Sequence, residues 1–177
     1  MYSELKGKVA VVTGGGAGIG LACATKLAEL GVAVGIADID AAAANEAANN
    51  LMSQGYRCLA LETDVSKAPQ VDQLFQATSE AFGPIGIAVN NAGVGAPLTP
   101  LGDTEESDFD RIMAVNLKGV WPGMRAALRH MTAQKSGPII NMASALSITT
   151  FPGSSLYTAS KHGVSGLPRR AAVDSGE

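Results

Sequence analysis

The sequence predicts an α/β fold in which a doubly wound parallel sheet is covered by helices on both faces. Short apolar runs alternate with longer helical patterns along the chain, and this alternation is typical of parallel β–α–β units. The apolar runs are nearly continuous rather than alternating with polar residues, as strands require when both faces of a sheet are buried. We see no linker, repeat or low-complexity segment, so residues 1–177 are expected to form a single domain.

Five strands and five helical patterns follow one another in this reading. The strands are expected at residues 8–14, 32–38, 56–64, 85–93 and 137–144. The helices are expected at residues 21–31, 41–55, 69–83, about 105–134, and from about 155 onward. Gly31 and Gly55 lie where glycine commonly closes a helix, and Pro69 suits the first turn of the third helix. The last helix carries Tyr157 and Lys161, which its spacing places on one face.

Composition excludes several classes of function. The chain is 46% hydrophobic with a net charge of only −3 and no basic stripe, which argues against nucleic-acid binding. No apolar run reaches the roughly 18 residues of a membrane span, and the polar start MYSELKGK is unlike a signal peptide. Cys23 and Cys58 match no metal-site spacing. We therefore expect free thiols, no metal, and a cytoplasmic protein.

The first strand runs into a glycine-rich turn, TGGGAGIG (residues 13–20), with Gly14, Gly18 and Gly20 at its key positions and Ile19 between the last two. It is neither the GxGxxG pattern nor a phosphate loop ending in GK[ST]. Such a turn lets the backbone approach a pyrophosphate, and the following helix presents its positive N-terminal end to that anion. The alternative is a tight strand-to-helix turn that binds nothing.

An acidic residue, Asp38, closes the second expected strand, 24 residues after Gly14. A carboxylate at this position can accept hydrogen bonds from the ribose hydroxyls of a dinucleotide, and it would repel a 2′-phosphate. Ala17 and Ile39 supply no basic residue that could bind such a phosphate. The sequence therefore favours NAD over NADP. The alternative is that Asp38 only caps the next helix.

Taken in order, these motifs resemble the short-chain dehydrogenase/reductase family over essentially the whole chain. TGGGAGIG matches the family's TGxxxGxG, and Asp38 falls on its cofactor-selecting position. The resemblance implies a Rossmann-like three-layer fold with NAD as cofactor. Two further matching segments would contact the cofactor: TDV (63–65), with Asp64 and Val65 at the adenine, and NNAG (90–93), with Asn91, Ala92 and Gly93 at the ribose. The remaining matches are VNLKG (115–119), which contains Asn116, the separate residue Ser144, and YTASK (157–161).

The resemblance also implies the chemistry, which is hydride transfer between a nicotinamide and a secondary alcohol or ketone carbon. Tyr157 would act as general acid/base, since a nearby ammonium from Lys161 favours the phenolate of a group with an ordinary pKa near 10. Tyr157 and Lys161 would also contact the cofactor, with Lys161 at the nicotinamide ribose. Ser144 would orient the reacting oxygen, and Asn116 would anchor a water in a proton relay.

Plainer readings of the same residues remain open. Tyr157 could be half-buried packing, Lys161 a solvated charge and Ser144 the cap of a turn. His130 and His162 are expected to have no catalytic role. The loops at 94–101 and 145–154 should rim the pocket, and their small, apolar residues favour a modest hydrophobic alcohol or ketone as substrate.

The sequence also departs from the family pattern. It ends soon after the catalytic helix begins, without the later strands of the family fold, which would leave the fifth strand as an exposed edge. Pro122 and Pro168 fall inside expected helices and should kink or break them. Those two helices form the family's dimer interface, so a homo-oligomer is expected only if they form. The alternative function is therefore a catalytically impaired NAD-binding fragment or module that needs further strands or a partner.

Overall fold

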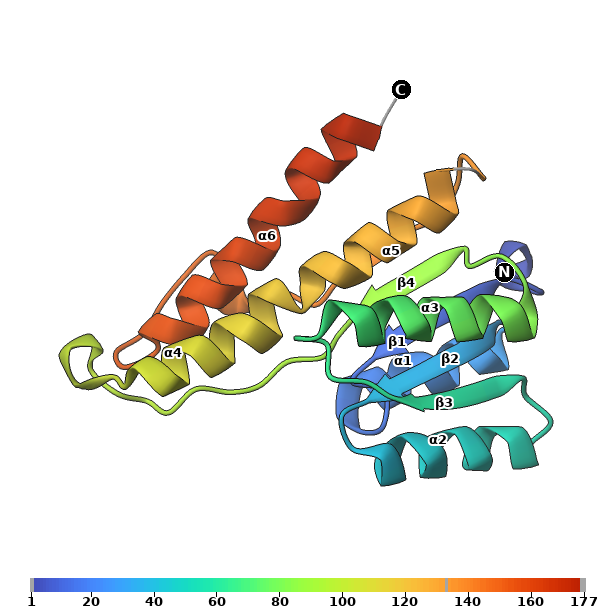
Figure 1. The fold of residues 1–177 in the computed structure, drawn as a ribbon, viewed down its shortest axis with the longest axis horizontal. Helices are drawn as coiled ribbons and strands as arrows, with labels where there is room; N and C mark the ends of the chain where they lie inside the picture. Colours follow the sequence, from blue (N-terminus) through green and yellow to red (C-terminus); the bar gives the residue numbers. More distant parts are fainter. Residues whose placement is uncertain (1, 133, 176–177) are drawn as a thin grey trace.

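The computed structural model describes residues 2–132 and 134–175, and its centre is one parallel sheet of five strands. The strand order is β3-β2-β1-β4-β5 (Figure 1). The strands are β1 (Val9–Thr13), β2 (Ala33–Asp38), β3 (Cys58–Glu62), β4 (Ile87–Asn90) and β5 (Ile139–Asn141). The chain builds outward from β1 to β3 and then returns to add β4 on the other side. This reversal opens a crevice at the carboxyl ends of β1 and β4, where ligands bind in such folds.

Helices cover both faces of the sheet, as the continuous apolar strands predict. On one face, Val9 and Val11 pack in a cluster with residues of α3 (Ala68–Phe82) and α5 (Val120–Thr132). On the other, Ala10 and Val12 pack with residues of α1 (Gly18–Glu29) and α2 (Ala41–Ser53). Successive residues of β1 thus enter opposite cores, and all five are buried. The predicted doubly wound fold is confirmed.

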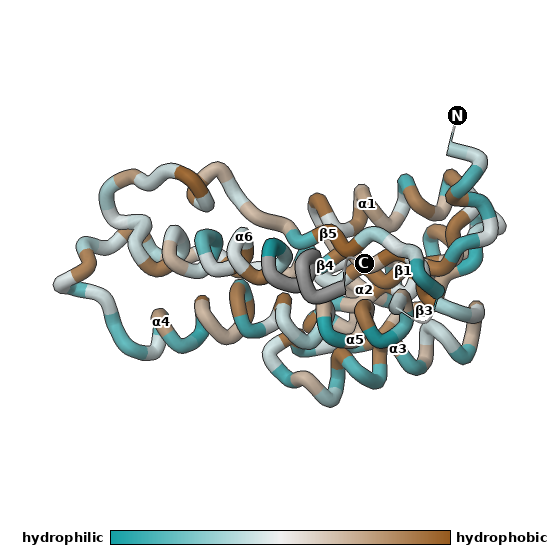
Figure 2. Tube along the Cα trace, turned by 90° about the horizontal axis from the view of Figure 1, so that it is seen from above, coloured by the Kyte–Doolittle hydropathy of each residue, from teal (hydrophilic) through white to brown (hydrophobic). Residues whose placement is uncertain are grey.

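The elements that carry the candidate site lie beyond the carboxyl ends of the strands. They include α4 (Glu106–Ile112), a π-helical segment (Met113–Lys118) and α6 (Ser155–Ser175). Figures 1 and 2 both show α4 and the first turns of α6 on the left, beyond the carboxyl ends of the strands. Short 3-10 turns complete the fold at Ser3–Leu5, Leu101–Asp103 and Ala145–Ser147.

The helical run expected over about residues 105–134 is present, but its backbone is not regular along its whole length. The chain forms α4, then the π segment, then α5. Pro122, where an irregularity is expected, has no N–H to donate to the carbonyl of Lys118, four residues earlier, and Lys118 is the last residue of a π-helical segment. The irregular backbone lies just before it, at Met113–Lys118, and contains buried Asn116. π segments of this kind often occur at functional sites.

The last helix also differs from its prediction. α6 continues through Pro168 without interruption from Ser155 to Ser175, so the expected break there is wrong. A proline inside a helix removes the hydrogen bond to the carbonyl four residues earlier, but the helix continues on both sides of Pro168. The expected weakness of a helix-mediated dimer remains an untested prediction.

Element ends shift by a few residues. α1 begins at Gly18 rather than at residue 21, so part of the glycine-rich turn is already helical. β5 spans only Ile139–Asn141, and within residues 2–132 and 134–175 it pairs with β4 alone, which makes it an edge strand here with Ile140 47% exposed. Cys23 and Cys58 are free thiols, as expected, and burial raises the pKa of Cys58 to about 11. Within the described residues, no helix combines the length and apolarity needed to cross a membrane.

Candidate functional site

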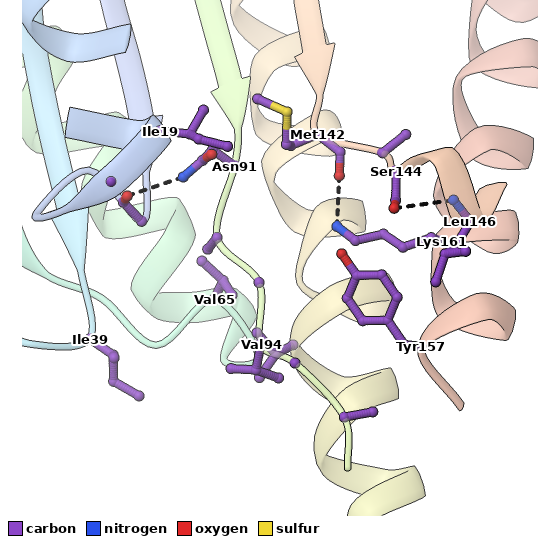
Figure 3. A pocket seen from close by; sticks show the side chains of 18 of the residues that line it. Ile19, Ile39, Val65, Asn91, Val94, Met142, Ser144, Leu146, Tyr157 and Lys161 are labelled. Carbon is purple, nitrogen blue, oxygen red and sulfur yellow. Dashed lines mark hydrogen bonds between the residues drawn. The ribbon is translucent and has the colours of Figure 1, made fainter. Parts of the chain in front are cut away.

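A cavity of about 880 Å³ lies at the carboxyl ends of the strands. Every residue proposed from the sequence lines it except Gly20 and Asn116. Figure 3 shows two ends, with Ile19 and Ile39 on one side and Ser144, Tyr157 and Lys161 on the other. We call these the glycine-turn end and the tyrosine end. Residues more than a hundred positions apart share this cavity because the carboxyl ends of the neighbouring strands β1, β4 and β5 all lead into it.

The glycine-rich turn forms the wall of the glycine-turn end and depends on glycine at two positions. Gly14 has φ +62°, and a Cβ there would lie 2.9 Å from the Cα of Ala92. A Cβ on Gly20 would overlap the carbonyl oxygen of Gly14, so Gly20 lies beneath the turn and lets α1 approach β1. The residue before α1, Ala17, offers no side-chain cap. The first-turn N–H groups of α1 therefore face no capping side chain, as an anion site at a helix N-terminus requires.

Asn91 joins the turn to the next strand end. Its side-chain amide donates to the carbonyl oxygens of Thr13 (3.0 Å) and Gly14 (3.1 Å). The Thr13 hydroxyl in turn accepts the backbone N–H groups of Asn91 (3.1 Å) and Ala92 (3.2 Å). These four bonds fix the ends of β1 and β4 against each other at the point where the cavity opens.

Asp38 is held by backbone groups at the end of β2. Its carboxylate accepts the N–H of Gly16 at 3.0 Å and the N–H of Asp40 at 3.1 Å. The helix cap considered for Asp38 is provided instead by Asp40, which accepts the N–H groups of Ala42 and Ala43. Beside Asp38, Ile39 is 67% exposed. Asp64 and Val65 line the same cavity, and Asp64 accepts the N–H of Ser66 at 2.9 Å.

The tyrosine end is built on the first turns of α6. Lys161 is only 4% exposed, and its ammonium donates to the Met142 carbonyl at 2.7 Å. Burial lowers the pKa of Lys161. The ammonium lies 5.7 Å from the centre of the half-buried Tyr157 ring, and Figure 3 shows the Tyr157 hydroxyl directed towards it. The solvated-charge reading of Lys161 is therefore wrong, because the lysine is buried within the site.

Ser144 has the capping role that the plainer reading proposed, and it also faces the cavity. Its hydroxyl accepts the N–H of Leu146 at 3.2 Å, and its own N–H donates to the Ser147 hydroxyl at 3.2 Å. Ser147 then donates to the Lys161 carbonyl at 2.9 Å. The cap therefore ties the loop after β5 to α6. Because the Ser144 hydroxyl only accepts in this cap, its proton is available to another oxygen.

Asn116 lies behind the cavity wall and is fully buried. Its side chain brackets one peptide unit, since it accepts the Val94 N–H at 2.7 Å and donates to the Val94 carbonyl at 2.9 Å. It also donates to the Ser160 hydroxyl at 3.3 Å. The π segment is thereby fastened both to the loop after β4 and to α6. The side chain is engaged in positioning the wall, whereas the water-anchoring role implied by the resemblance stays a prediction.

Several lining residues were not identified from the sequence. Met142 contributes through its carbonyl group, and no side-chain pattern marks a backbone acceptor. Ser147 and Ser160 do not line the cavity, but Ser147 donates to the Lys161 carbonyl and Ser160 accepts the Asn116 amide, and neither role was expected from the sequence. Leu146 belongs to the 145–154 loop that was expected to rim the pocket, whereas Thr63, Val115 and Ala143 line the cavity without having been singled out. Among the described residues, no group of three or more His, Cys, Asp or Glu side chains is arranged to hold a metal ion.

Comparison with known proteins gives consistent results. A family profile described as short chain dehydrogenase matches residues 8–177. The cis-4-hydroxycyclohexanecarboxylate dehydrogenase of Sinomonas cyclohexanicum is 41% identical over 166 residues, which cover 94% of this chain and 66% of the relative. The 2-(R)-hydroxypropyl-CoM dehydrogenase of Xanthobacter autotrophicus is 39% identical over 94% of this chain and 68% of its own length.

Solved structures agree with these relatives. A short-chain dehydrogenase/reductase from Burkholderia phymatum in complex with NAD superposes with a TM-score of 0.93 at 38% identity, covering 97% of this chain and 61% of that chain. An NAD⁺-bound xylitol dehydrogenase gives a TM-score of 0.92 at 32% identity over 97% of this chain and 66% of that chain. The chain thus spans about two thirds of the length of the proteins it matches.

Proposed function

The chain belongs to the short-chain dehydrogenase family, and on that premise we propose that it interconverts a secondary alcohol and a ketone with NAD as the cofactor. NAD, when bound, accepts the hydride during alcohol oxidation and supplies it during ketone reduction. Because the chain spans about two thirds of its relatives' length, both activity and substrate are proposals for the whole protein.

The glycine-turn end fits a dinucleotide. Gly14 and Gly20 let backbone come close where a Cβ would not fit, and the uncapped start of α1 suits a pyrophosphate. The Asp38 carboxylate is placed to accept ribose hydroxyls and to repel a 2′-phosphate. Ile39 offers no positive charge to compensate. These features support NAD rather than NADP.

The tyrosine end supports proton transfer at the reacting oxygen. In the oxidation direction, the Tyr157 phenolate oxygen takes the alcohol proton while the carbon loses a hydride. In the reduction direction, the Tyr157 hydroxyl returns that proton to the ketone oxygen. The Lys161 ammonium stabilises negative charge on the tyrosine oxygen, and the Ser144 hydroxyl donates to the substrate oxygen.

One observation carries this proposal above the others. The buried Lys161 ammonium lies beside the Tyr157 hydroxyl, inside the cavity that the glycine turn also lines. In the described structure its one hydrogen-bond acceptor is the Met142 carbonyl. Burying a lysine without a carboxylate partner costs stability. A purely structural role does not explain why the fold retains it.

A second candidate function is NAD binding without turnover. It is favoured by the position of β5, which has a hydrogen-bonded neighbour on one side only within the described chain. The loop that carries Ser144 follows this edge strand, so its position relies on fewer strand contacts than the glycine-turn end does.

The test separates cofactor binding from turnover. NADH fluorescence is titrated with the purified chain, with NADPH as comparator and Tyr157→Phe as a variant that keeps the ring. We expect saturable binding that prefers NADH for both chains, and alcohol-dependent NADH formation only with Tyr157 present. Binding without turnover of any secondary alcohol supports the second candidate. No NADH binding by a soluble, monodisperse chain contradicts both.

A further inference from the structure

The wall of the tyrosine end is a loop fixed at two points. At one, Asn116 brackets the Val94 peptide unit. At the other, the Thr99 N–H donates to the Gly153 carbonyl at 3.0 Å and joins this loop to the loop after β5. Leu98 lies just before the second point and lines the cavity. The wall is therefore positioned before any ligand arrives.

The side chains of this wall are apolar. Val94, Ala96, Leu98, Leu146 and Phe151 line the cavity there, and Leu98 and Phe151 remain 69% and 47% exposed at its rim. Ser154 is the nearby hydroxyl, but it donates to the Phe151 carbonyl at 2.6 Å and lies 3.0 Å from the Thr158 hydroxyl. Its hydrogen-bonding capacity is thus used within the fold.

Charged groups at the cavity are few and poorly placed for an anion. Of the lining residues that the structure describes, the charged ones are Asp38, Asp64 and Lys161. The two acids belong to the glycine-turn end, and Lys161 is buried against the Met142 carbonyl. Arg111 reaches the Gly95 carbonyl at 3.5 Å, but it does not line the cavity and pairs with Asp108 at 2.8 Å.

We propose that the tyrosine end selects uncharged, apolar alcohols and ketones over anionic ones, with Leu98 and Phe151 as specificity-determining residues. This inference rests on the proposed function for the identity of the reacting group. A carboxylate on the substrate would lose water against Leu98 and Phe151. Among the described lining residues it would meet no cation except Lys161, which is buried against the Met142 carbonyl, so this loss is unfavourable. An apolar ring at the same place is stabilised by burial.

The experiment compares two ketones that differ by one charge, cyclohexanone and 4-oxocyclohexanecarboxylate. Their dissociation constants for the full chain are measured by ligand-observed NMR at neutral pH, with and without saturating NADH. We expect cyclohexanone to bind at least tenfold more tightly, a difference of about 1.4 kcal/mol. Equal or tighter binding of the carboxylate, or no binding of cyclohexanone, overturns the inference.

A matched pair of variants tests the assigned wall. Leu98 and Leu101 are similarly exposed, at 69% and 67%, but only Leu98 lines the cavity. Leu98→Arg should tighten carboxylate binding about tenfold, and added salt should weaken the gain. Leu101→Arg should change it less than about twofold. Equal effects of the two variants would show that general surface charge, not the wall, sets the preference.

Failure of this inference is distinguishable from failure of the proposed function. A chain that does not bind NADH contradicts the proposed function, while the ketone comparison without NADH still tests the wall. A chain that binds NADH and turns over the carboxylate ketone more efficiently than cyclohexanone supports the proposed function and overturns the inference.

Discussion

Replacing Asn116 by aspartate changes one atom in the bracket that holds the cavity wall. The NH₂ group that donates to the Val94 carbonyl and to Ser160 becomes an oxygen, while the oxygen that accepts the Val94 N–H is retained. The site is fully buried. The substitution therefore removes a donor and sets a carboxyl oxygen against a carbonyl oxygen.

The expected cost of Asn116→Asp follows from these contacts. Losing the 2.9 Å bond to the Val94 carbonyl costs about 1 kcal/mol, and leaving that buried carbonyl without a donor costs about 1–3 kcal/mol more. The longer bond to Ser160 adds little, because the Ser160 hydroxyl keeps its bond to the Tyr157 carbonyl. We expect the free energy of unfolding to fall by about 2–4 kcal/mol. For a chain of this length, each kcal/mol lowers the melting temperature by about 2–4 °C, so a fall of roughly 4–16 °C is expected.

The cost of Asn116→Asp should also depend on pH. Burial beside the Val94 carbonyl raises the pKa of the new carboxyl above its ordinary value of about 3.9. The folded chain then binds this proton more tightly than the unfolded chain. The protonated form is favoured below the unfolded pKa, and that advantage is lost as pH rises through the raised pKa. The variant should approach the original chain at low pH and fall furthest below it near pH 8.

Differential scanning calorimetry at pH 5 and pH 8 measures both effects. The melting temperature of Asn116→Asp is compared with that of the original chain at the same pH, so that the titration of the other carboxyl groups cancels. Asn49→Asp, at an exposed position of α2, is the control and should shift stability by less than about 0.5 kcal/mol. Equal melting temperatures for Asn116→Asp and the original chain, or a larger difference at pH 5 than at pH 8, would refute this reasoning.

Three further predictions concern buried side chains and helical glycines. The Thr78 hydroxyl is buried and has no hydrogen-bond partner among the residues that the structure describes, so Thr78→Val should raise stability by about 1 kcal/mol. Thermal melts beside Thr78→Ser check this, and a lowered melting temperature contradicts it. Because burial lowers the pKa of Lys161, its protonated form destabilises the fold at neutral pH. Lys161→Met should therefore melt higher at pH 7, with the difference shrinking as pH rises towards about 10.5, while turnover is lost; a lower melting temperature would argue against it. A Cβ on Gly123 would overlap the Asn90 side chain, whereas one on Gly166 of α6 meets open space. Gly123→Ala should lower the free energy of unfolding by about 1–3 kcal/mol, and Gly166→Ala should raise it by up to about 1 kcal/mol. Urea melts in which both variants shift in the same direction would be inconsistent with these contacts.

The fold class was predictable because each strand of this sheet is a separate apolar run. Glycine-rich turns and the alternation of strand and helix patterns are local signals. They predicted the first and last residues of β1, β2 and α2 to within a few positions. The π-helical form of the backbone at Met113–Lys118 was not predictable in this way. There the backbone follows the buried bonds of Asn116 to Val94, which lies 22 residues earlier, and no local pattern records such a partner.

The candidate site was predictable in part for the same reason. Tyr157 and Lys161 are four residues apart, so their shared face follows from helix geometry alone. The acceptor for Lys161 is the backbone of Met142, and a carbonyl group leaves no trace in residue type. For Ser144 the sequence allows either a turn cap or a cavity residue, and its spacing from Tyr157 does not distinguish these roles. In the structure Ser144 has both.

The bonds between Asn91 and the end of β1 have a consequence for the entropy of binding. A flexible phosphate loop must be ordered when its ligand arrives, and each residue ordered opposes binding by about 1–2 kcal/mol. Here the Thr13 and Gly14 carbonyl groups accept the Asn91 side-chain amide, and the Thr13 hydroxyl accepts the N–H groups of Asn91 and Ala92. The Gly16 N–H is likewise bonded to Asp38. A dinucleotide would therefore meet a turn whose conformational entropy was lost during folding, and its contacts would appear more fully as affinity.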